Sequence, residues 1–289
     1  MNQYLDAWAA MLADPLMQRA LLVAALVGAA APIVGTYLVQ RRLALLGDGI
    51  GHVALTGVAL GWLIGSGLGL APGALAVPGA IAAAVLGAIA IELVRATGRT
   101  SGDLALAIMF YGGIAGGALL IKLAGGTSAN LVAYLFGSLA TVSPADVVTT
   151  LALCGTVMVV GLSLRWALLA VTTDQQAARA AGLPTHAYNI ALATLTALTV
   201  TTAMRVVGLL LVSALMIVPV AVAQLGTKSF SRTMAVATAI GIGVALAGLV
   251  LSYWYDLPPG ASIVVLAIVL YALVAALRPL VTRRRVVQQ

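Results

Sequence analysis

Residues 43–64 read LALLGDGIGHVALTGVALGWLI, a stretch of 22 residues whose only ionisable side chains are Asp48 and His52. About 20 apolar residues suffice to cross a bilayer as a helix. The stretch therefore predicts a transmembrane helix, and similar stretches on both sides of it predict an all-α membrane protein.

Asp48 and His52 lie four residues apart, so on a helix their side chains project from the same face. Charged and polar groups are costly in hydrocarbon and normally face a bundle interior or a wet cavity. A carboxylate oxygen and an imidazole nitrogen together suit a divalent cation such as zinc or manganese. The alternative is a polar pair that is satisfied near the lipid headgroups at a helix end.

The composition agrees with a membrane protein. The chain has 289 residues, of which 62% are hydrophobic and 8% charged, whereas soluble domains carry about 25% charged residues. We interpret residues 1–289 as one transmembrane domain, and we explain the net charge of +7 by membrane topology rather than by nucleic acid binding. The single Cys154 excludes an intrachain disulfide and a cysteine metal cluster.

Nine stretches are long and apolar enough to predict a polytopic helical bundle of about nine spans, with eight as the other possibility. They are residues 16–40, 43–64, 71–94, 103–123, 146–168, 187–204, 206–224, 232–254 and 260–280. Residues 130–140 are too short to span and predict a re-entrant or interfacial piece. Gly-x-x-Gly spacings such as Gly113 to Gly116 predict close helix packing.

Basic residues predict the orientation, since cytoplasmic loops are enriched in lysine and arginine. With an external N-terminus and nine spans, twelve basic residues are cytoplasmic: Arg41, Arg42, Arg95, Arg99, Arg165, Arg179, Lys228, Arg232, Arg278, Arg283, Arg284 and Arg285. Three are external: Arg19, Lys122 and Arg205. We therefore expect a multi-pass protein of the plasma or inner membrane with a cytoplasmic C-terminus, whose basic tail 281–289 contacts lipid headgroups.

The segment 172–186 is the longest polar interruption between spans. Asp174 or the threonine before it can cap a short helix, and Gly182 followed by a proline ends it. A helix of about two turns is marginal alone in water, so we expect it to dock on a partner. The alternative is an ordinary surface connection.

Several motifs in order resemble the zinc/manganese permease family, the membrane subunits of metal-type ATP-binding-cassette importers. Residues 47–61 look like the family's Asp-x-x-x-His-Ala-x-x-Pro-Gly-x-Ala pattern, with Thr56 in place of the common proline and Gly51 in place of the usual serine. The other matching stretches are residues 135–138, 142–146, 174–184, 207–219 and 259–261. The resemblance runs nearly end to end.

The resemblance implies a homodimeric, or occasionally heterodimeric, permease that binds an ATP-binding cassette ATPase subunit and receives metal from an extracytoplasmic metal-binding protein. It implies that Asp48 and His52 bind the transported zinc, manganese or iron, and that no cofactor is bound permanently. It also assigns residues 174–184 to coupling with the ATPase. The expected coupling residues are Asp174, Gln175, Ala177, Ala178, Arg179, Ala181 and Gly182, and we expect Ala177, Ala178 and Ala181 to be exposed and to seat in a groove of the ATPase.

Other polar residues receive structural interpretations. Glu92 and Asp103 are interpreted as solvated at the membrane interface, with a role of Asp103 in metal exit as the alternative. His186 is interpreted as an interfacial histidine, Ser213 and Met216 as packing residues, and Asp256 as part of an external aromatic belt.

No enzyme signature is present: the sequence has neither a phosphate loop ending in Lys-Ser or Lys-Thr nor a His-Glu-x-x-His motif. Two other transport functions stay open. One is a vitamin or iron-chelate importer permease, and the other is an ion-coupled secondary transporter that uses Asp48 as a proton relay.

Overall fold

Each of the nine predicted stretches contains a helix. The structure, a computed structural model, describes residues 2–71, 73–98, 102–125, 132, 134–137, 142–204 and 207–286, and all their side chains except those of residues 2–5, 210–211 and 279–286. Its helices are α1 (Asn2–Ala13), α2 (Pro15–Gln40), α3 (Leu46–Gly67), α4 (Ala76–Thr97), α5 (Gly102–Leu123), α7 (Pro144–Ser163), α8 (Arg165–Thr173), α9 (Gln175–Ala180), α10 (Thr185–Ala203), α11 (Leu209–Gly226), α12 (Phe230–Tyr255) and α13 (Pro259–Val286).

Seven of these helices are long and apolar enough to cross a membrane, among the described residues: α2, α3, α4, α5, α7, α12 and the part of α13 up to Arg278. A shorter apolar helix covers Val212–Gly226 in α11. The all-α, multi-pass architecture is confirmed, and the number of spans stays a prediction. The interfacial role of residues 130–140 and the lipid contacts of the basic tail 281–289 lie largely outside the described residues.

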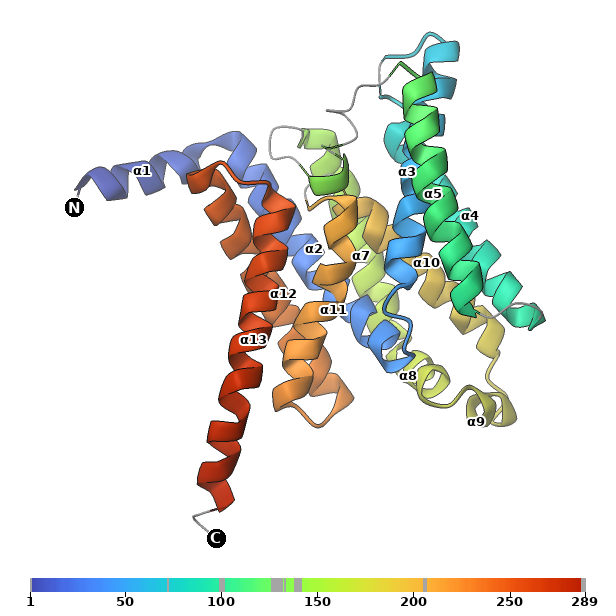
Figure 1. Cartoon of the computed structure of the whole chain (residues 1–289), viewed down its shortest axis with the longest axis vertical. Helices are drawn as coiled ribbons and strands as arrows, with labels where there is room; N and C mark the ends of the chain where they lie inside the picture. The colour runs from blue at the N-terminus through green and yellow to red at the C-terminus, as the bar shows by residue number, and fades with distance from the viewer. Residues whose placement is uncertain are drawn as a thin grey trace.

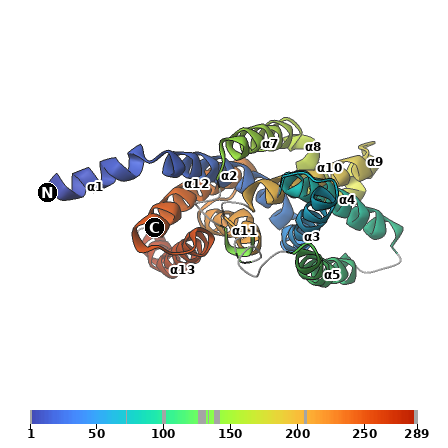
Figure 2. The same ribbon diagram turned by 90° about the horizontal axis from the view of Figure 1, so that it is seen from above.

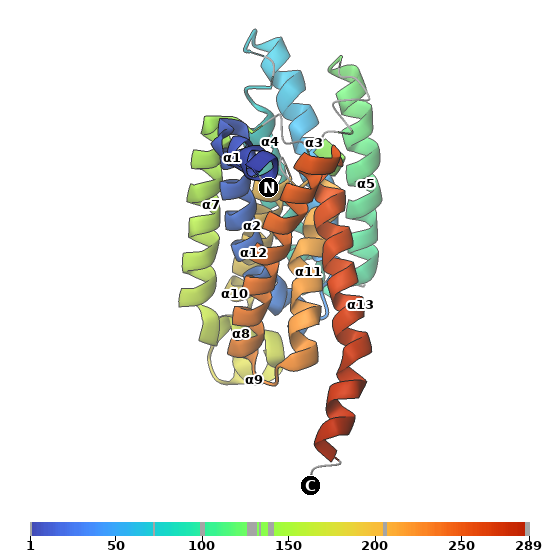
Figure 3. The same cartoon turned by 90° about the vertical axis from the view of Figure 1, so that its left-hand side faces the viewer.

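The helices form a bundle around α2 (Figure 1). Helices α12 and α13 lie on one side of it and α3, α4 and α5 on the other, while α7 and α11 lie on opposite faces (Figure 2). The N-terminus and α1 are at one end of the bundle, and α9 and the C-terminus are at the other (Figure 3). The chain thus places its two termini at opposite ends.

Helix α2 is the centre of the core because glycines let neighbouring backbones approach it. A Cβ atom on Gly28 would lie 2.7 Å from the carbonyl oxygen of Gly241 on α12. A Cβ on Gly35 would lie only 1.8 Å from the carbonyl oxygen of Met216 on α11. Small residues at such crossings let the two backbones come into direct contact, which favours helix association in lipid.

The predicted span 146–168 is two helices in the structure. It starts earlier, at Pro144, because Ser143 and Asp146 form a capping box that closes the first turn. It ends at Ser163, since the backbone of Leu164 leaves the helical region at φ −87° and ψ 10°. Helix α8 then continues to the polar segment, so the apolar crossing and the approach to α9 are separate elements.

Candidate functional site

Asp48 lies in the first turn of α3, and His52 follows one turn later. No side chain caps this end of α3, and a carboxylate in the first turn is favoured because it faces the positive end of the helix dipole. Asp48 is half-buried, whereas His52 is 1% exposed. Both predicted site residues thus belong to the region where α3 packs against α5 and α11.

The carboxylate of Asp48 is held from a distant part of the chain. The hydroxyl of Ser213, on α11, donates a hydrogen bond to Asp48 Oδ1. The interpretation of Ser213 as a packing residue is therefore wrong. Its position inside the family motif 207–219 could have indicated a functional role. A partner of this kind fixes the orientation of a ligating carboxylate.

His52 presents a nitrogen to which no described residue bonds. Its Nδ1 is buried and has no hydrogen-bond partner among the described residues. The ring packs edge-on against Phe110 of α5, with the centroids 4.4 Å apart. Buried polar atoms are normally paired, so an orphaned imidazole nitrogen one turn from a carboxylate fits a role as a metal ligand.

Close contact between α3 and α5 encloses His52. A Cβ on Gly113 would lie 2.5 Å from the backbone carbonyl carbon of His52, which confirms the predicted packing role of this glycine. The Thr56 hydroxyl donates to the Gly113 carbonyl oxygen over 2.9 Å. The threonine that replaces the family's common proline thus ties α3 to α5 directly.

The other ionisable candidates do not join this pair. In the part of the chain that the structure describes, no group of three or more His, Cys, Asp or Glu side chains is placed to hold a metal ion. Asp103 is exposed and precedes Gly113 by ten residues on α5, which corresponds to about 15 Å along the helix. His186 is exposed as well. Asp48 and His52 are therefore two donors that need further ligands from elsewhere.

The predicted cap and stop of α9 are confirmed. Asp174 Oδ1 accepts hydrogen bonds from the backbone amides of Gln176 and Ala177, at 2.9 and 3.0 Å. At the other end Gly182 has φ +84°, and its amide and that of Leu183 bond back to carbonyls of the last turn. This is a Schellman motif, which requires the left-handed conformation that glycine adopts without strain.

One expected feature of α9 is wrong. Ala178 was expected to be exposed, but it is 5% exposed because it faces the rest of the protein, where α9 contacts α8 and α10. Ala177, Arg179 and Ala181 are exposed. The exposed surface of α9 and its C-cap therefore includes these residues and excludes Ala178.

A polar contact ties α9 to the turn before α3. Arg41 follows the end of α2, and its Nη2 donates to Oε1 of Gln175 over 3.3 Å. Burial lowers the pKa of the Arg41 guanidinium, Glu92 opposes this by raising it, and Arg95 lowers it further. Arg41 precedes Asp48 by seven positions, so the coupling segment and the candidate metal site are linked by a short piece of chain.

Glu92 is buried rather than solvated, which corrects its interpretation. It is 4% exposed, and its carboxylate lies 3.5 Å from Nη1 of Arg95. A buried carboxylate must be paired, since leaving it alone in a low dielectric is costly. Glu92 is placed to balance the two arginines at the end of the bundle that holds α9.

Comparison with known proteins identifies related chains. The profile described as the ABC 3 transport family matches residues 13–278. Manganese transport system membrane protein MntC of Halalkalibacterium halodurans is 34% identical over 257 residues, or 89% of this chain and 85% of the relative. A probable iron transport system membrane protein of Haemophilus influenzae is 31% identical over 260 residues, or 90% and 93%.

The fold is shared with a solved structure. A chain of PsaBC from Streptococcus pneumoniae, determined in complex with Fab, superposes with a TM-score of 0.81 at 30% identity. The match covers 93% of this chain and 95% of that chain. The family match over residues 13–278 includes both Asp48 and α9.

Proposed function

Because the chain belongs to the ABC 3 transport family and is a permease subunit of metal-type ATP-binding-cassette importers, we propose that it forms the membrane pathway for a divalent metal ion. The proposed cargo is zinc, manganese or iron. Relatives named as manganese and iron transport proteins support this class of cargo. The metal is a substrate that passes through, and no permanent cofactor is proposed.

The observation that carries the proposal is the unpartnered Nδ1 of His52, one helical turn from the Asp48 carboxylate. A neutral imidazole supplies a nitrogen ligand and Asp48 supplies an oxygen ligand. The Ser213 hydroxyl holds the carboxylate in place. Two donors are too few for a four-coordinate ion, so we propose that a second copy of the chain supplies its own Asp48 and His52 at a shared site.

Coupling to ATP hydrolysis is proposed to run through α9. The exposed Ala177 and Ala181 are small enough to let this segment enter a groove on an ATPase subunit, with Arg179 exposed beside them. Movement of α9 would act on Arg41 through Gln175, and from there on the start of α3. The ATPase is a separate partner subunit, and an extracytoplasmic metal-binding protein delivers the ion at the opposite end.

The proposed orientation places α9 and the C-terminus in the cytoplasm and the N-terminus outside, in a plasma or inner membrane. Three features support it. The two termini lie at opposite ends of the bundle (Figure 3), α9 shares its end with the C-terminus, and the basic residues Arg41, Arg95 and Arg179 gather at or near this end.

The proposal is tested with the complete complex of permease, ATPase and binding protein in proteoliposomes. Loading the binding protein with zinc, manganese or iron should stimulate ATP hydrolysis and metal uptake together, and competition among the three ions identifies the cargo. Uptake that proceeds without the ATPase under a proton gradient would contradict the proposal and favour a secondary transporter. Stimulation by a chelate or a vitamin, with none by free metal, would identify an importer of larger substrates.

A further inference from the structure

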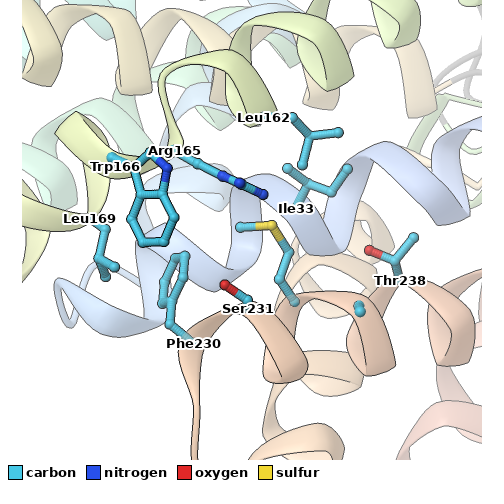
Figure 4. Close-up of a pocket in the computed structure, with 10 residues that line it drawn as sticks. Ile33, Leu162, Arg165, Trp166, Leu169, Phe230, Ser231 and Thr238 are labelled. Atoms are coloured by element: carbon cyan, nitrogen blue, oxygen red, sulfur yellow. The ribbon is translucent and has the colours of Figure 1, made fainter.

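A cavity of about 420 Å³ lies among α2, α7, α8 and α12, away from the candidate metal site (Figure 4). Its walls are mostly apolar and include Ile33 from α2, Leu162 from α7 and Phe230 from the first turn of α12. Leu162 is 45% exposed, so the α7 side of the cavity reaches the surface of the bundle. A cavity of this size accepts a group as large as a lipid headgroup with the first part of an acyl chain.

Among the described residues that line the cavity, Arg165 alone carries a charge. It extends from the start of α8 across the cavity, above Phe230 and Ser231 of α12 (Figure 4). Its guanidinium carbon lies 4.9 Å from the centroid of the Trp166 ring. Among the described residues no carboxylate forms an ion pair with it, which leaves its donors available to an anion.

The cavity lies at the boundary of the membrane. The candidate span of α7 ends at Ser163, two residues before Arg165, and α8 leads directly to α9. Trp166 is 65% exposed, as expected for a tryptophan at the headgroup level. Lys228 and Arg232, which flank the lining residues Phe230 and Ser231 in the sequence, are exposed and add positive charge at the start of α12.

We propose that this cavity binds an anionic phospholipid of the leaflet on the α9 side. The phosphate would lie between the Arg165 guanidinium and the Ser231 hydroxyl, and an acyl chain would lie along Ile33 and Leu162. Basic cavities between transmembrane helices on this side of a bilayer favour acidic headgroups. A zwitterionic lipid binds less tightly, because no carboxylate among the described lining residues can pair with its cationic group.

The test measures lipid binding to the complete, detergent-purified chain by native mass spectrometry, with phosphatidylglycerol and phosphatidylcholine as probes. Wild-type protein should bind phosphatidylglycerol about fivefold more tightly, the contribution of one basic residue near a membrane surface. Arg165→Gln should abolish this preference. Arg278→Gln removes the same charge at an exposed position of α13, outside the cavity, and should retain the preference.

A second variant tests the cavity itself. Ala235 lines it and is exposed, so Ala235→Trp should fill the space and reduce binding of both lipids while Arg165 keeps its charge. Equal binding of the two lipids by wild-type protein, or equal losses in Arg165→Gln and Arg278→Gln, would overturn the proposal. So would displacement of phosphatidylglycerol by millimolar inorganic phosphate, which would indicate a simple anion site. Lost ATPase binding in Arg165→Gln with unchanged lipid binding would assign the cavity to the partner subunit and refute a lipid site.

Discussion

Replacing Ser213 with alanine tests whether the Asp48 carboxylate is held for metal binding. The substitution removes the hydroxyl that donates to Asp48 Oδ1 and changes little else. The Cβ stays in place, 3.6 Å from the position that a Cβ on Gly47 would occupy, so the contact between α11 and α3 is retained. Any effect therefore reports the lost hydrogen bond.

The magnitude follows from the burial of the carboxylate. A hydrogen bond to a charged group contributes about 1.5–3 kcal/mol. Asp48 is half-buried, so water replaces part of the lost interaction and the lower figure applies. About 1.4 kcal/mol corresponds to a factor of ten, and loss of a partner that orients a metal ligand typically weakens metal affinity 10–100-fold. We expect the KM for metal uptake to rise about tenfold.

Uptake by the reconstituted complex, measured over a range of metal concentrations, checks this value. The matched control is Ser252→Ala, since Ser252 on α12 is also a buried serine and donates to the carbonyl of Leu257, just after the end of that helix. A KM that changes less than twofold in Ser213→Ala would show that the Ser213 hydroxyl does not hold the Asp48 carboxylate for metal binding. An equal rise in both variants would mean that the effect comes from general loosening of the bundle.

Three further predictions concern packing and coupling. Gly35→Ala would place a Cβ 1.8 Å from a carbonyl oxygen of α11, so the yield of folded protein should fall severalfold, whereas Gly155→Ala, with no atom within 4 Å, should purify normally in the same size-exclusion assay. Ala177→Glu should weaken pull-down of the ATPase without changing the folded yield. Normal pull-down would mean that the exposed face of α9 is not the surface that binds the ATPase. Gln175→Ala removes the contact with Arg41; we expect ATPase binding to persist while uptake per ATP hydrolysed falls at least twofold, and an unchanged ratio would exclude this link.

The sequence predicted those features that depend on local order. Long apolar stretches are sufficient for helices in a membrane, because every backbone group must bond within its own segment there. The end signals of α9 were equally local, and both Asp174 and Gly182 act as expected. The pair of Asp48 and His52 was found because ionisable residues are so rare in the spans that each one stands out.

The features that the sequence did not predict depend on contacts between distant segments. Ser213 is 165 residues from Asp48, and a hydroxyl in an apolar helix gives no local sign of its partner. Glu92 looked like a solvated residue because nothing in its own segment indicates that the fold buries it. The burial of Ala178 is of the same kind, since alanine is compatible with either face of a short helix and only the docked position of α9 decides.

The most direct test of a metal site at Asp48 and His52 is uptake by the reconstituted complex carrying His52→Ala. The chain contains only two histidines, so His186→Ala, a change at an exposed position, is the matched control. We expect His52→Ala to lower metal uptake to the background of vesicles without ATP while the permease still binds its ATPase. Asp48→Asn should do the same, and His186→Ala should transport normally. Wild-type uptake by His52→Ala and Asp48→Asn would contradict the account.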